Sequence, residues 1–156
     1  MQPVGVEEVR RQAHRMAEQC PGRRITRLHR LVGRRFDAEL RQSGLTLQQL
    51  EVLSELAMSG EPARPSEIAN WLGLERSTVS RNLDVLTQRG HVQASATSST
   101  GRTTQVVITD AGYQALADAA PAWHRAQAWL AEAVGPEAVE VLDRWLAVLH
   151  PDQQTR

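Results

Sequence analysis

Residues 64–109 constrain the fold of this chain more than any other stretch, because the hydrophobic pattern within them changes its period. The first part holds two short helical patterns, 66–72 and 77–89, with apolar residues three and four positions apart. Gly73 lies between them, and glycine allows the backbone conformation that a sharp turn needs. Two short helices joined by a turn that contains glycine predict a helix-turn-helix.

The second part of this stretch has the alternating pattern of β-strands. Residues 91–97 alternate between apolar and polar side chains, and residues 103–108 are mostly β-branched, which are both strand signals. The segment SSTG at 98–101 is rich in turn-forming residues, so we expect an antiparallel hairpin with its tip there. The whole stretch predicts a winged helix-turn-helix.

Helical patterns flank this unit on both sides. On the N-terminal side, apolar residues at helical spacing predict a helix over 21–44, and the Thr46-x-x-Gln49 capping box predicts the start of another. On the C-terminal side, a long helix should run from Thr109-Asp110 to about residue 133, bent or broken at Pro121. A last helix is expected over 136–149, with an inward stripe formed by Val139, Leu142, Leu146 and Leu149.

The charge of the whole chain gives no sign of a nucleic-acid partner, because 18 basic residues balance 18 acidic ones. All the basic residues are arginines, and they gather in the first two thirds of the sequence, including seven within 21–45. A local basic surface on a neutral protein can still bind phosphate. No apolar run is long enough for a membrane span or a signal-peptide core, so we expect a soluble, cytoplasmic protein.

The second helix of the helix-turn-helix carries the candidate DNA contacts. Its apolar positions point inward, which leaves small hydroxyl side chains and Arg81 on the face that would enter a major groove. Arg81 can pair bidentately with guanine, and Arg76 lies beside the helix N-terminus, where exposed N–H groups favour phosphate. On the hairpin tip, an arginine can reach an adjacent minor groove. The predicted DNA-binding residues are Arg76, Ser77, Thr78, Ser80, Arg81 and Arg102.

Three segments together resemble the multiple-antibiotic-resistance regulator (MarR) family: LTLQQLEVLSEL (45–56), PSEIANWLGLERSTVSRNLDVLTQRGHV (65–92) and GRTTQVVITDAG (101–112). The resemblance implies a homodimer that binds pseudo-palindromic double-stranded DNA, commonly as a repressor relieved by a ligand or an oxidant. It predicts these segments: an N-terminal arm or loose helix (1–20), a dimerisation helix (21–44), the winged helix-turn-helix DNA-binding domain (45–109), C-terminal dimerisation helices (110–150) and a tail (151–156).

The sequence departs from the family pattern at two places. The family's wing usually carries Asp-x-Arg, whereas this chain has Thr100-Gly101-Arg102 and so lacks the acid that braces the arginine. The short helix usually has a Ser or Thr cap before its proline, whereas Arg64 precedes Pro65 here.

Two sensing hypotheses remain open. Cys20 lies close in sequence to two arginines, and nearby positive charge raises thiol reactivity, so it is a candidate redox sensor. Alternatively, a small aromatic effector could bind beside His29, Arg30 and Trp123. An inert Cys20 is the simpler interpretation of that residue, and the tryptophans could complete a monomer core instead of a dimer interface.

The competing classes of function have little support in the sequence. No phosphate-binding glycine loop, nucleophile elbow or paired carboxylate frame is present, so we expect no enzyme activity and no cofactor. The five histidines show no metal-ligand spacing, and a single cysteine excludes an internal disulfide. The alternative to a DNA-binding regulator is a winged-helix interaction module that has lost DNA binding.

Overall fold

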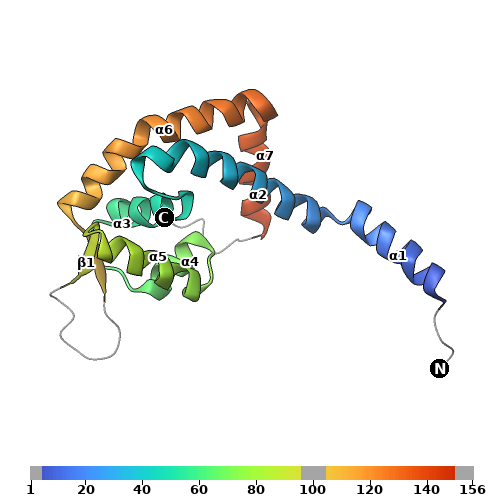
Figure 1. Cartoon of the computed structure of the whole chain (residues 1–156), viewed down its shortest axis with the longest axis horizontal. Helices are drawn as coiled ribbons and strands as arrows, with labels where there is room; N and C mark the ends of the chain where they lie inside the picture. The colour runs from blue at the N-terminus through green and yellow to red at the C-terminus, as the bar shows by residue number, and fades with distance from the viewer. Residues whose placement is uncertain (1–4, 96–104, 150–156) are drawn as a thin grey trace. The chain divides into compact units, whose positions relative to one another are not determined.

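The computed structural model describes residues 5–95 and 105–149, which belong to two compact units, Met1–Arg35 and Phe36–Arg156 (Figure 1). The fold is mainly helical with one two-stranded hairpin, as predicted. No helix among these residues is both long and apolar enough to cross a membrane.

The first unit holds helix α1 (Val6–Gln19) and most of α2 (Pro21–Leu40). Cys20 separates the two helices with an extended backbone, φ −71° and ψ 111°. No side chain of α1 is buried, and its surface carries ion pairs one helical turn apart, such as Arg10 with Glu7 and Arg11 with Glu8. Such exposed pairs add little stability each, so α1 is a solvated helix.

The second unit is built around helix α3 (Leu47–Ser59), which follows the short 3-10 helix η1 (Arg41–Ser43). The predicted capping box begins α3: the Gln49 N–H donates to Thr46 Oγ1 at 3.3 Å, and the Thr46 N–H donates to Gln49 Oε1 at 3.2 Å. Its Val52, Leu53 and Leu56 are fully buried. Helices α4 (Pro65–Leu72) and α5 (Arg76–Gln88) pack against α3 and close the core.

Strands β1 (Val92–Ala94) and β2 (Val106–Ile108) pair antiparallel, with Val92 opposite Ile108. A third segment joins this small sheet, which the sequence pattern did not predict. Ala63, whose stretch has no strand pattern, exchanges two backbone hydrogen bonds with Val106, at 3.0 and 2.9 Å. Strand β2 is therefore hydrogen-bonded on both sides.

Helix α6 (Asp110–Val134) starts at Thr109, whose Oγ1 accepts from the Gly112 N–H at 3.1 Å. The sequence predicted a bend or a break at Pro121, and the helix continues through this residue without a break. Buried alanines on both sides of the proline, Ala119 and Ala122, hold the helix against the core.

Helix α7 (Glu137–Leu149) does not have the inward-facing apolar stripe that the sequence pattern predicted. The helix has no buried residue, and the side chains predicted to face a core are 41% to 75% exposed: Val139, Leu142, Leu146 and Leu149. Periodicity identified the apolar face correctly, but no part of the described chain buries it.

Candidate nucleic-acid interface

The turn of the helix-turn-helix is set by Gly73, which has φ 62° and ψ 30°. Residues with a Cβ rarely adopt this left-handed conformation. The Gly73 N–H donates to Asn70 O at 3.3 Å and the Leu74 N–H to Ala69 O at 2.9 Å, so the last carbonyls of α4 are satisfied. The chain can then turn at once into α5.

The start of α4 is capped in an unexpected way. Arg64 holds the cap position without a capping side chain, and Glu67 compensates because its Oε2 accepts from the Arg64 N–H at 2.6 Å. The Glu67 carboxylate also lies 3.8 Å from the Arg64 guanidinium. Arg64 is therefore a paired residue at the helix start, and its charge is partly neutralised.

Helix α5 is held against the core by Val79, Leu83 and Leu86, as the pattern predicted. A polar contact adds to this packing: the Asn82 side-chain amide donates to Gln48 Oε1 of α3 at 3.3 Å and to Thr78 O at 3.1 Å. Sequence reasoning missed Asn82. The sequence did contain a signal for this contact, because Asn82 lies three residues after Val79, at the edge of the apolar stripe.

The opposite side of α5 is the recognition face, which we define as Arg76, Ser77, Thr78, Ser80 and Arg81. All of these are exposed except Thr78, which is half-buried. Arg81 lies along the first turn of the helix, with Nε donating to Ser77 O at 3.2 Å and Nη2 3.5 Å from Ser77 Oγ. Within the described chain Arg81 forms no ion pair with a carboxylate, so its charge is free to meet an anion.

Hydrogen bonds fix the base of the wing. The Ser95 N–H donates to Gln105 O at 2.8 Å, and the Gln105 side chain donates to Pro62 O at 3.4 Å. Together with the Ala63 bridge, these bonds tie the hairpin stem to the segment that leads into α4. The predicted wing contact, Arg102, lies outside the described residues.

Arg89 has a role that its charge alone did not reveal. Its guanidinium donates to the carbonyl oxygen of Gly44, 45 residues earlier in the chain. It thereby ties the end of α5 to the loop that follows η1. Of the arginines in the described helix-turn-helix, Arg76 and Arg81 remain for anion contacts.

The sensing candidates lie in different parts of the molecule. Cys20 is an exposed free thiol between α1 and α2. His29 and Arg30 are exposed on α2 in the first unit, whereas Trp123 is half-buried on α6 in the second and packs edge-on against His124, with ring centroids 5.0 Å apart. Among the described residues, no group of three or more His, Cys, Asp or Glu could hold a metal ion.

A helix-turn-helix with an exposed hydroxyl-and-arginine face, beside an anchored hairpin, defines the class of winged-helix DNA-binding regulators. A family model described as MarR family matches residues 43–102, which include every candidate DNA contact. The transcriptional regulator MosR of M. tuberculosis is 32% identical, covering 86% of this chain and 96% of its own, with a TM-score of 0.74. The chain belongs to the MarR family of transcription regulators.

Several of the similar structures contain DNA or a ligand. MosR in complex with DNA is 30% identical over 85% of this chain and 97% of its own, with a TM-score of 0.71. The transcriptional repressor CouR bound to a 23-mer DNA duplex is 27% identical over 86% and 94%, with a TM-score of 0.72. CouR bound to p-coumaroyl-CoA is 25% identical over 88% and 96%, with a TM-score of 0.74. No curated protein matches the sequence significantly.

Proposed function

We propose that this chain is a homodimeric repressor that binds a pseudo-palindromic DNA site through α5 and the wing, and that a small ligand or an oxidant releases it. The observation that carries the DNA contact is the recognition face, whose Ser77, Ser80 and Arg81 are exposed on a helix held rigidly by its opposite side. The DNA complexes of MosR and CouR support the same use of this fold. Such a protein acts by binding alone, without turnover of a substrate, in the cytoplasm where the DNA is.

The proposal of a dimer rests on apolar surface that the described chain leaves uncovered. Trp145 is 48% exposed and the apolar stripe of α7 surrounds it, while Ile25, Leu28 and Leu31 on α2 are 43% to 52% exposed. Exposed apolar surface of this kind marks an interaction site. A two-fold dimer would also present two recognition helices to the two halves of a palindrome.

A gel shift with fragments from around the protein's own gene tests the DNA contact. We expect a shift. The logarithm of the DNA affinity should fall linearly with the logarithm of the salt concentration, because counterions are released when the protein contacts phosphates. Protein that shifts no such fragment at low salt would leave a winged-helix interaction module as the better interpretation.

The release step has two candidate triggers. A small aromatic effector is the first candidate, and the p-coumaroyl-CoA complex of CouR supports a ligand of this kind. An oxidant would act at the exposed Cys20. Peroxide should release DNA from the wild type and not from Cys20→Ser if the thiol is the trigger, and an equal response of both proteins would reject that role.

A further inference from the structure

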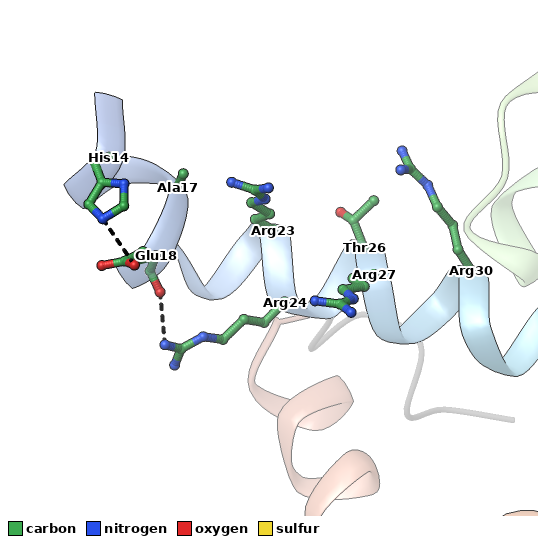
Figure 2. A pocket seen from close by; sticks show the side chains of 8 residues that line it. All are labelled: His14, Ala17, Glu18, Arg23, Arg24, Thr26, Arg27 and Arg30. Atoms are coloured by element: carbon green, nitrogen blue, oxygen red, sulfur yellow. Dashed lines mark hydrogen bonds and ion pairs between the residues drawn. The ribbon is translucent and has the colours of Figure 1, made fainter. Parts of the chain in front are cut away.

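The elbow between α1 and α2 forms a cleft of about 850 Å³ within the first unit (Figure 2). Helix α1 contributes the side chains of His14 and Glu18 to its lining. Helix α2 contributes four arginines within eight positions: Arg23, Arg24, Arg27 and Arg30. We call this site the arginine cleft.

The positive charge of the arginine cleft is largely uncompensated. The only carboxylate in its lining, that of Glu18, is 3.1 Å from His14 Nε2. Arg24 donates to the backbone oxygen of Glu18 at 2.9 Å and so has a neutral partner. Within the described chain, the other three have neither an ion pair nor a hydrogen bond: Arg23, Arg27 and Arg30.

These three arginines share one face of α2. They follow each other at spacings of four and three, which places them in a row along about 10 Å of helix. Figure 2 shows Arg23 and Arg30 extending to the same side of the helix. Like charges at these spacings destabilise a helix, and an anion bound between them removes that repulsion.

Phosphate is the anion that fits such a row. The guanidinium group is planar and its N–H groups match phosphate oxygens two at a time, so neighbouring arginines can hold neighbouring phosphates. A concave site between two helices accommodates a small molecule better than it accommodates the convex backbone of a DNA duplex.

We propose that the arginine cleft binds a small organic diphosphate, of the kind that a nucleoside diphosphate carries. The row formed by Arg23, Arg27 and Arg30 supplies the contacts to the phosphates. This site lies apart from the recognition face, so its existence does not depend on the proposed DNA-binding function.

Isothermal titration of the full-length protein without DNA tests the proposal, with ADP, inorganic pyrophosphate and adenosine as probes. ADP and pyrophosphate should bind, and adenosine, which lacks the phosphates, should not. The triple variant Arg23→Gln/Arg27→Gln/Arg30→Gln should lose about tenfold or more of the ADP affinity, because each lost partner was a charge-assisted hydrogen-bond donor.

A matched control removes the same charge from α1. In Arg10→Gln/Arg11→Gln/Arg15→Gln, the lost arginines all pair with Glu7 or Glu8 and none lines the cleft. This variant should bind ADP as the wild type does, and helix content by circular dichroism should show that both triple variants are folded.

Several outcomes would overturn the proposal. These are a wild type that binds neither ADP nor pyrophosphate, equal binding of ADP and adenosine, and equal loss of affinity in the two triple variants. If the wild type does not bind ADP and the triple variant of the arginine cleft binds DNA more weakly, the three arginines would instead form a surface that contacts the DNA backbone. Because the titration contains no DNA, a failed diphosphate site leaves the gel-shift test of the regulator untouched.

Discussion

Arg81 and Arg89 are exposed arginines eight residues apart that form different contacts. Arg89 ties the end of α5 to the Gly44 carbonyl, whereas Arg81 bonds only within its own helix and keeps its charge accessible. A count of charges along the sequence treats the two alike. Their difference depends on a contact with a residue 45 positions away, which no local pattern encodes.

Replacing Arg81 by alanine should weaken binding to the operator and relax its sequence preference. The loss of one bidentate base contact costs about 1–3 kcal/mol, or about 5- to 150-fold in affinity. Competition gel shifts with operator and random DNA measure both effects. Equal affinity of the variant and the wild type for the operator would refute the role assigned to Arg81.

Arg102→Ala should instead weaken binding to all sequences alike, because a wing arginine in a minor groove mainly meets phosphate and groove potential. The slope of log affinity against log salt should become shallower by about 0.9 for each lost phosphate contact. Titrations at several salt concentrations, with operator and random DNA side by side, measure this slope. A selective loss on the operator would assign Arg102 a base contact.

At the scale of elements, the helices with chemical end signals were predictable. The Thr46–Gln49 capping box and the glycine after α4 set boundaries that local chemistry decides. The Ala63 bridge was not predictable, because its stretch lies between two prolines and has no strand pattern. The face of α7 was misassigned because periodicity shows that a face is apolar and does not show what covers it.

The turn between α4 and α5 can be tested with a pair of glycines. Gly73→Ala should lower the free energy of unfolding by about 1–2 kcal/mol, because alanine is strained at φ 62°. No heavy atom lies within 4 Å of the added Cβ, so the cost is conformational rather than steric. Urea denaturation measures it.

Gly33→Ala is the matched control. Gly33 lies inside α2, its Cβ would also meet open space, and its φ is not positive. This change should leave stability unchanged or raise it by up to about 1 kcal/mol, because alanine favours a helix. If both alanines act alike, backbone conformation at Gly73 does not set the turn.

At the scale of the whole molecule, the uncovered stripe of α7 predicts association. Leu146→Glu should raise the dissociation constant of the proposed dimer, because burying an unpaired carboxylate costs about 2–5 kcal/mol. Arg144→Glu places the same carboxylate on the same helix off the apolar stripe and should leave the dimer intact. Analytical ultracentrifugation measures both, and dimers of equal stability would exclude α7 from the interface.

Strand β2 is hydrogen-bonded to β1 on one side and to Ala63 on the other. Thr109 comes directly after β2 and caps the start of α6. These contacts join the stem of the wing, the helix-turn-helix and the start of α6 at one point. We expect a displacement carried along α6 to move the DNA-binding unit, which comprises these elements, as one body. In the proposed dimer, an effector would then act by changing the distance between the two DNA-binding units, and the shape of each unit would stay the same.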